Sequence, residues 1–140
     1  NDPLNPRSID SDVINKWNNT YVEWWGRMSN MKEVLCQSDI VCLPSYREGL
    51  PKVLLEAASC EKAIITTDVP GCREIVKHGY NGFLVPNKDY LKLAEAIEKL
   101  IEDKDLCKKM GKYGRKLVIK KFSNRIVIMQ TLKLYKNIFL

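Results

Sequence analysis

The chain has 140 residues, of which 45% are hydrophobic and 29% charged, and its 23 Lys and Arg against 17 Asp and Glu give a formal net charge of +6. These values are typical of one soluble globular domain with its own core, and they exclude an intrinsically disordered chain. No apolar run approaches the roughly 20 residues that span a bilayer, and we expect no signal peptide. The basic balance fits a nucleic acid, a nucleotide or an anionic membrane surface as partner and does not choose among them.

Five cysteines are scattered along the chain, an odd number in which no pair has CxxC spacing. We expect buried free thiols at Cys36, Cys42 and Cys60, in a reducing compartment, in place of a disulfide framework. A zinc site is not expected, because the cysteines do not cluster and His78 is the only histidine.

The first part of the chain predicts a loop, a helix and a strand. Asn1 to Arg7 is rich in Pro and Asn and favours a loop, and Ser8 to Asn19 is expected to form a short helix. The aromatic and β-branched segment Tyr21-Val-Glu-Trp-Trp25 predicts a strand. We expect the three tryptophans to lie in or near the core: Trp17, Trp24 and Trp25.

Strands and helices alternate in the rest of the chain. Ile40-Val-Cys-Leu43 and Ala63-Ile-Ile-Thr-Thr67 predict strands that are buried on both faces, and Phe83-Leu-Val85 predicts a third. Helices are expected at residues 30–37, from Pro51 to about 60, from Gly71 to 77, and at about 89–102, 104–121 and 124–140. This alternation predicts an α/β fold, a Rossmann-like parallel sheet with flanking helices and a helical C-terminal tail.

The loop after residue 43 carries the candidate chemistry, because ligands of such sheets bind beyond the carboxyl ends of the strands. Glu48 lies in this loop, and Glu56 lies more than one turn into the next helix. The helix N-terminus between them attracts an anion such as a diphosphate, while each carboxylate accepts hydrogen bonds from sugar hydroxyls. Gly49 lets the backbone approach a ligand closely. The residues alone favour a plainer interpretation, in which Glu48 stabilises the helix start and Lys52 pairs with Glu56.

Five segments together resemble glycosyltransferase family 4, whose members are retaining enzymes with the GT-B fold. The stretch from Glu48 to Glu56 resembles the Glu-x7-Glu motif of that family. The other segments are Val22-Glu-Trp-Trp-Gly26, Ser38-Asp-Ile-Val-Cys-Leu-Pro-Ser45, Thr67-Asp-Val-Pro-Gly-Cys-Arg-Glu-Ile-Val76 and His78-Gly-Tyr-Asn-Gly-Phe-Leu-Val-Pro86. They cover about residues 1–136 in the correct order. The variant with Arg-Glu-Gly-Leu-Pro and Gly-Cys-Arg-Glu is similar to transferases of bacterial capsule, O-antigen and glycan-lipid assembly.

The resemblance implies roles for the residues of the motif. Glu48 is expected to hold hydroxyls of the donor hexose and to orient it, and Glu56 to bind the ribose hydroxyls. The backbone N–H groups around Gly49, Leu50 and Lys52 are expected to meet the sugar or the diphosphate.

The same resemblance places Val53 against the ribose and Arg27 and Met28 beside the nucleobase. Many relatives have Gly where this chain has Pro51. Because proline has no N–H, the diphosphate has to be held by the neighbouring amides or by water.

The implied activity is transfer of a hexose or N-acetylhexosamine, with retention, from a UDP-linked nucleotide sugar to a hydroxyl of a glycan or polyprenyl-linked glycan. No metal or other cofactor is expected. GT-B enzymes have two Rossmann-like domains, and residues 1–140 resemble the later part of the second. We therefore expect a partial donor-binding domain that lacks the N-terminal acceptor domain, is inactive alone, and belongs to a cytoplasmic enzyme at the inner face of the plasma membrane.

Two alternatives to an enzyme stay open at this point, a non-catalytic nucleotide-sugar-binding module and a basic nucleic-acid-binding domain. The second would need a cationic stripe interleaved with aromatic side chains, and the cations instead crowd one helix, so no nucleic-acid partner is expected. Residues 104–121 hold eight Lys or Arg and one acid. A solvated face is the plainer interpretation of these cations, and contact with anionic lipid is the alternative.

Local signals complete the sequence-based predictions. Asp10-Ser-Asp12 and Asp103-Lys-Asp105 fit helix capping better than metal–diphosphate binding. His78 is expected to be a cation at a helix end, and Arg73 and Glu74 to form a local pair. In the helix at 104–121 we expect a core stripe of Leu106, Met110, Tyr113 and Leu117. The last helix is so apolar that we expect an exposed patch and self-association.

Overall fold

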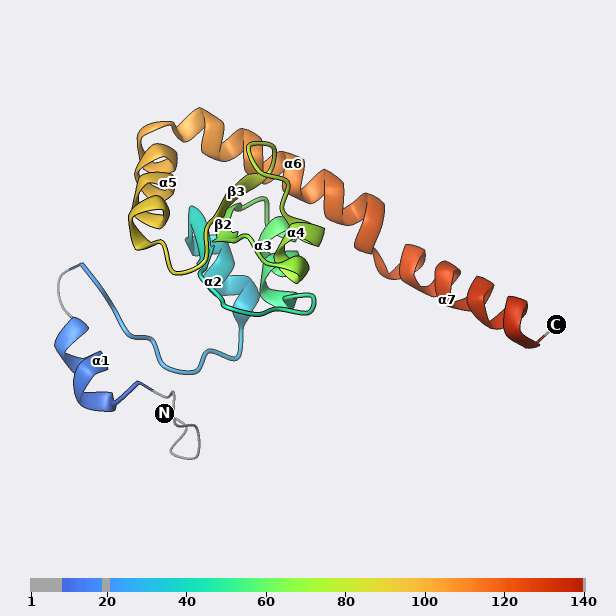
Figure 1. The fold of residues 1–140 in the computed structure, drawn as a ribbon, viewed down its shortest axis with the longest axis horizontal. Helices are drawn as coiled ribbons and strands as arrows, with labels where there is room; N and C mark the ends of the chain where they lie inside the picture. The colour runs from blue at the N-terminus through green and yellow to red at the C-terminus, as the bar shows by residue number, and fades with distance from the viewer. Residues whose placement is uncertain (1–8, 19–20, 140) are drawn as a thin grey trace. The chain divides into compact units, whose positions relative to one another are not determined.

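The computed structural model describes residues 9–18 and 21–139, which contain three short strands and seven helices joined by loops (Figure 1). The chain divides into two units, Asn1–Met31 and Lys32–Leu140. The loop predicted for Asn1 to Arg7 lies outside the described residues.

The described part of the first unit contains one complete helix, α1 (Ser11–Trp17), which is shorter than predicted. Asp10 stands at its N-cap position, and the Asp10 carboxylate accepts a hydrogen bond of 3.1 Å from the backbone N–H of Asp12. This geometry satisfies one of the free N–H groups at the helix start. The capping role predicted for the first Asp-x-Asp sequence is therefore confirmed.

The strand predicted for residues 21–25 is absent from the structure. The segment is irregular, and the Trp24 N–H bonds to the side chain of Asn18 at 2.9 Å. A strand is stable only beside a hydrogen-bonded neighbour, and the one sheet in the described residues is built from three later strands. The expectation of buried tryptophans is also wrong, since all three are about half exposed: Trp17, Trp24 and Trp25.

The sheet of the second unit is parallel and has the order β1 (Ile40–Leu43), β2 (Ala63–Thr67) and β3 (Gly82–Val85). Ile40 pairs with Ala63, and Ile64 pairs with Gly82. The carboxyl ends of all three strands therefore meet at one edge. This arrangement confirms the predicted α/β fold with a parallel sheet.

Helices precede and follow the strands as predicted: α2 (Met31–Gln37), α3 (Lys52–Ser59), α4 (Pro70–Ile75), α5 (Tyr90–Glu102), α6 (Lys104–Phe122) and α7 (Asn124–Phe139). Asp103 caps α6 by accepting a 2.8 Å hydrogen bond from the N–H of Leu106. The second Asp-x-Asp sequence is thus also a helix cap. Pro51 was predicted to be the first helical residue, but in the structure it is the extended N-cap of α3. The helix predicted from Gly71 to 77 is α4, which begins one residue earlier and ends at Ile75.

The core lies around β2, whose five residues are all buried, as predicted for a strand covered on both faces. One face packs into a cluster of Ala63, Ile65, Phe83, Val85, Leu100 and Met110. The same prediction is wrong for β1, which lies at the edge of the sheet and is only partly buried.

All five cysteines are free thiols, as expected, but their burial differs from the prediction. Cys36 and Cys42 are exposed and Cys60 is half-buried, whereas Cys72 is buried. Cys42 is exposed because it lies on the edge strand β1.

A glycine of α6 allows this helix to pack closely against the connection between α3 and β2. A Cβ atom on Gly111 would collide with the backbone carbonyl of Glu61, in the connection between α3 and β2. Only a residue without a side chain allows this approach. Along the same helix Met110 is buried, while the other members of the predicted core stripe are half-buried: Leu106, Tyr113 and Leu117.

Helix α7 extends beyond the end of α6 and away from the sheet (Figure 1). The predicted apolar patch is confirmed, and its side chains are about half exposed: Val127, Ile128, Met129, Leu132, Leu134, Tyr135 and Ile138. Among the residues that the structure describes, no helix combines the length and the apolar character needed to cross a bilayer.

Candidate active site

The loop between β1 and α3 forms an open hollow at the carboxyl edge of the sheet. Its volume is about 640 Å³, and its walls are Tyr46, Arg47, Glu48, Gly49 and Pro70. Parallel sheets bind their ligands at this edge. The structure therefore puts Glu48 and Gly49 where a ligand of this fold is expected.

The Glu48 carboxylate is held in place by a neighbouring hydroxyl. The Oγ atom of Ser45 donates a hydrogen bond of 2.5 Å to Oε1 of Glu48. Thr67, the last residue of β2, donates in turn to the backbone carbonyl of Ser45. Glu48 is thus tied to the ends of two adjacent strands.

Close packing against α4 also fixes the loop. A Cβ atom on Gly71 would collide with the backbone carbonyls of both Glu48 and Gly49. Gly71 is buried, so this space cannot be gained by a shift into solvent. A Cβ on Gly49 would meet no protein atom within 4 Å, so the close approach of its backbone to a ligand stays a prediction.

Glu56 lies in the second turn of α3 and faces Lys52, whose Nζ is 3.3 Å from Oε1 of Glu56. The side chain of Glu56 is 34% exposed and that of Lys52 is 87% exposed. The predicted i,i+4 pair is therefore present. Because Lys52 is almost fully solvated, the pair is weak and leaves the Glu56 carboxylate available to another partner.

The other residues predicted for the site differ in their surroundings. Leu50 is about half exposed and Val53 is half-buried, both beside the start of α3. Pro51 supplies no side-chain cap, so this helix start keeps N–H groups without a capping side chain. Arg27 and Met28 belong to the first unit and are exposed, and their contact with a nucleobase stays a prediction.

The negative charge of Glu48 affects the pKa of the buried thiol of Cys72. Burial raises the pKa of Cys72, a hydrogen bond from Thr66 lowers it, and the negative charge of Glu48 raises it further. The Thr66 hydroxyl lies 3.1 Å from the Cys72 sulfur.

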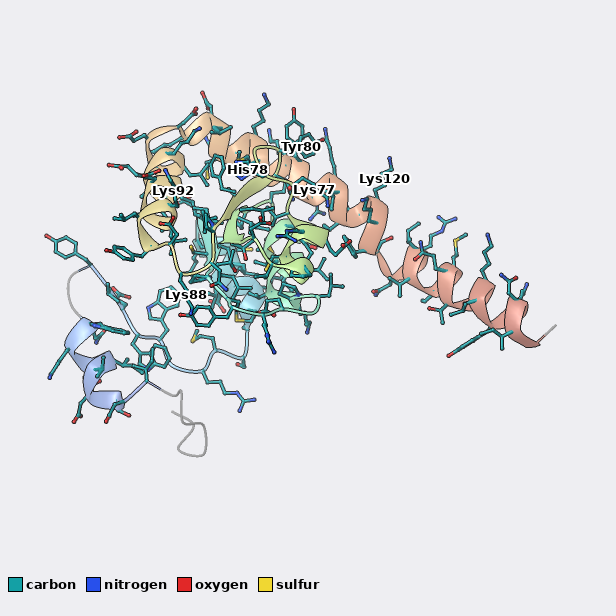
Figure 2. All side chains as sticks on the ribbon, viewed as in Figure 1. Lys77, His78, Tyr80, Lys88, Lys92 and Lys120 are labelled. Carbon is teal, nitrogen blue, oxygen red and sulfur yellow. The ribbon has the colours of Figure 1, made fainter. Side chains whose placement is uncertain are left out.

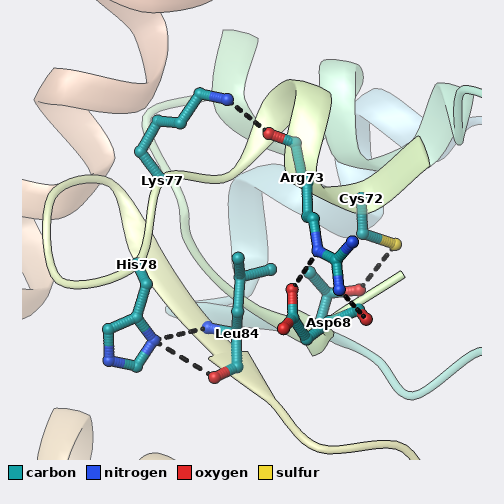
Figure 3. A network of polar contacts seen from close by, with 7 residues as sticks. Asp68, Cys72, Arg73, Lys77, His78 and Leu84 are labelled. Atoms are coloured by element: carbon teal, nitrogen blue, oxygen red, sulfur yellow. Dashed lines mark hydrogen bonds and ion pairs between the residues drawn. The ribbon is translucent and has the colours of Figure 1, made fainter. Parts of the chain in front are cut away.

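The segment after β2 contains polar contacts that the sequence did not predict (Figure 3). Arg73 pairs with Asp68 at 2.5 Å, not with Glu74. Nδ1 of His78 lies 3.1 Å from both the backbone N and the carbonyl oxygen of Leu84, in the edge strand β3. His78 lies three residues beyond the end of α4, so its interpretation as a helix-end cation is wrong.

Comparison with known proteins identifies the family. The family described as "Glycosyl transferases group 1" matches residues 12–117. The chain belongs to the group 1 glycosyl transferases. This membership agrees with the resemblance carried by the Glu-x7-Glu segment, from Glu48 to Glu56.

Two curated relatives of this group 1 glycosyl transferase are named as bacterial glycosyltransferases. One is an N,N'-diacetylbacillosaminyl-diphospho-undecaprenol alpha-1,3-N-acetylgalactosaminyltransferase of Campylobacter jejuni, 35% identical over 86% of this chain and 32% of the relative. The other is the capsular polysaccharide biosynthesis glycosyltransferase CapM of Staphylococcus aureus, 40% identical over 73% of this chain and 27% of the relative. The chain thus spans about a third of the length of these relatives.

Solved structures of GT-B glycosyltransferases share the fold. A glycosyltransferase of Rickettsia africae superposes with a TM-score of 0.82 at 26% identity, over 90% of this chain and 34% of its own. The Anabaena protein HepE in complex with UDP superposes with a TM-score of 0.80 at 24% identity, over 83% of this chain and 32% of its own. At that identity the likeness to HepE shows the fold alone.

Proposed function

We propose that this group 1 glycosyl transferase chain is the donor-binding part of a retaining glycosyltransferase that uses a UDP-linked sugar. The observation that carries the proposal is the position of Glu48 in the hollow at the carboxyl edge of the sheet, with Glu56 in the second turn of the helix that follows. Ser45 holds the first of these carboxylates before any ligand arrives. Such preorganisation lowers the cost of binding and orienting a substrate.

Each part of the donor has a partner of suitable chemistry. The hydroxyls of the donor hexose, or N-acetylhexosamine, donate hydrogen bonds to the Glu48 carboxylate. The diphosphate lies at the amides of Leu50 and Lys52, near the positive end of α3. The ribose hydroxyls displace Lys52 from Glu56, an exchange that costs little for so exposed an ion pair. The reaction uses no metal.

One relative supports the choice of acceptor, since the Campylobacter jejuni protein is named for a diphospho-undecaprenol acceptor. HepE, which shares the fold, has been solved with UDP and with UDP-glucose. By analogy, the acceptor hydroxyl of this enzyme belongs to a glycan that is linked to a polyprenyl diphosphate.

Kinetics of single variants test this proposal in the enzyme. We expect Glu48→Ala to lower kcat by roughly a hundredfold, the loss of a charge-assisted contact to the reacting sugar. Glu56→Ala should raise the KM for the donor by about tenfold with a smaller effect on kcat. Glu98→Ala, an exposed carboxylate of α5, is the matched control. Wild-type kinetics in both test variants would refute the assignment, and donor binding without turnover would favour the non-catalytic module.

We further propose that the enzyme binds the cytoplasmic face of an anionic membrane through α6. Its eight Lys and Arg side chains are all exposed, and residues 106–140 contain ten Lys or Arg and no Asp or Glu. Tyr113 lies among these cations, with Lys109 and Lys116 each 5.9 Å from its ring centre. Each cation near an anionic surface contributes about 1 kcal/mol.

Vesicle flotation tests the membrane proposal. The enzyme should float with phosphatidylglycerol vesicles and stay behind with phosphatidylcholine vesicles, and Lys109→Glu with Lys116→Glu should abolish the difference. Lys32→Glu, an exposed cation of α2, is the control. Equal flotation with both lipids would refute an electrostatic contact.

A further inference from the structure

A second hollow lies beside the one that contains Glu48. Its volume is about 450 Å³, and Tyr46, Thr67, Pro86, Lys88 and Tyr90 are among its lining residues. Thr67 ends β2, and Pro86 follows β3, so this hollow too opens at the carboxyl edge of the sheet. Tyr46 lines both hollows. The two therefore form adjoining parts of one surface.

Two tyrosine rings stand at this hollow without being part of the core. Tyr46 is 59% exposed and Tyr90, the first residue of α5, is 75% exposed. Exposed aromatic rings offer an apolar face, and their hydroxyls offer hydrogen bonds at the rim. A pyranose ring has the matching surface, with C–H groups on its faces and hydroxyls around its edge.

The charged groups of the hollow favour a sugar over a phosphate. The Asp89 carboxylate caps α5 by accepting a 2.9 Å hydrogen bond from the N–H of Lys92, so the helix start is already occupied by a negative charge. A nucleotide phosphate there would meet that charge. Lys88 has its Nζ 5.8 Å from the ring centre of Tyr46 and is a ready donor to hydroxyl oxygens. In Figure 2, Lys88 lies apart from Lys120 of α6.

We infer that the hollow between Tyr46 and Tyr90 binds a pyranose unit of the acceptor glycan. The inference rests on the proposed function, because the donor sugar held by Glu48 would then lie next to the bound glycan, with Tyr46 between them. It assigns part of acceptor recognition to the same domain that binds the donor. Thr67 connects the two sites, since it lines this hollow and also holds Ser45, the partner of Glu48.

Ligand-observed saturation-transfer NMR tests the inference with two neutral probes, maltotriose and chitotriose, and separately with UDP. At least one oligosaccharide should receive saturation from the protein at millimolar concentration. Tyr90→Ala should weaken its affinity by about tenfold, the loss of one stacked ring, and leave UDP binding unchanged. Tyr90→Phe should retain the affinity for the oligosaccharide. Leu91→Ala, a neighbouring exposed residue of α5, is the control for the fold.

The arms of this experiment separate the inference from the proposed function. Glu56→Ala should weaken UDP and spare the oligosaccharide. Loss of UDP binding in Glu56→Ala together with unchanged oligosaccharide binding in Tyr90→Ala and Tyr46→Ala would overturn the inference alone. Absence of saturation transfer to both oligosaccharides would overturn it as well. Failure of UDP to bind wild-type protein would contradict the donor site. The sugar-binding hollow is tested separately, by the oligosaccharide measurements.

Discussion

Ser45 and Glu48 share a hydrogen bond of 2.5 Å between Oγ and Oε1, which fixes a carboxylate at the mouth of an otherwise open loop. Ser45 is itself anchored, because its carbonyl accepts a hydrogen bond from Thr67 at the end of β2. The carboxylate therefore takes its position from two strands of the sheet and not from the loop alone.

Replacement of Ser45 by alanine should lower turnover while donor binding changes little. Removal of a hydrogen bond to a charged group costs about 1.5–3 kcal/mol, which corresponds to a 10- to 100-fold drop in kcat if Glu48 acts on the reacting sugar. Ser45→Thr should restore most of the activity, because it keeps the hydroxyl. Unchanged kcat in Ser45→Ala, with Ser59→Ala as control, would show that Glu48 needs no such support.

Alanine substitutions at two glycines of the site should differ in their effect on the free energy of unfolding. Gly71→Ala forces a collision with the carbonyls of Glu48 and Gly49 and should destabilise the fold by about 2–3 kcal/mol, measured by denaturant unfolding. Gly49→Ala adds a methyl group to open space and should leave the stability within about 0.5 kcal/mol. Donor affinity should nevertheless fall in Gly49→Ala, because Gly49 lines the hollow and an added methyl group there restricts close approach of a ligand. Equal unfolding free energies for both variants would contradict the packing.

The ion pair of Asp68 and Arg73 predicts a pH effect. The hydrogen bond from Arg73 lowers the pKa of the Asp68 carboxyl below its usual value. A carboxyl group with a lowered pKa in the folded state stabilises the fold above its unfolded-state pKa, and this stabilisation is lost as the pH falls through the folded-state pKa. In Arg73→Gln the NMR-detected pKa of Asp68 should rise and this acid-dependent loss should shrink. An unchanged Asp68 pKa would show that the pair does not persist in solution.

The apolar side chains of α7 predict self-association of the isolated chain. Several are about half exposed, Ile128 and Leu132 among them, and exposed patches of this kind drive association. Light scattering should report species above the 16.2 kDa of one chain, and Ile128→Lys with Leu132→Lys should return the chain to that mass. Lys133→Gln, a polar change on the same helix, serves as control. A strictly monomeric wild-type chain would contradict the expectation.

Strands and helices of the second unit could be predicted because their signals are local. The apolar runs that became β1 and β2, and the aspartates that cap α5 and α6, act within a few residues of themselves. The segment at residues 21–25 has the composition of a strand but not the structure. Strand formation depends on a neighbouring strand, which composition does not reveal. The burial of the tryptophans was misjudged for the same reason.

The sequence predicted the two carboxylates of the candidate site but not the residues that hold the loop in place. Glu48 and Glu56 were identified by their spacing and by resemblance to a family. Ser45 and Gly71 were missed, because their importance arises from contacts across the loop and with α4 that exist only after folding. A hydroxyl three residues before a loop carboxylate is the one sequence signal that could have indicated Ser45.

Amide chemical shifts during a titration with UDP test the central claim most directly. If the donor lies between Glu48 and Glu56, the amides of Gly49, Leu50, Lys52 and Val53 should shift most, and Glu56→Ala should weaken the binding by about tenfold. Shifts confined to other parts of the chain, or an affinity for UDP that Glu56→Ala leaves unchanged, would contradict the donor site at the start of α3.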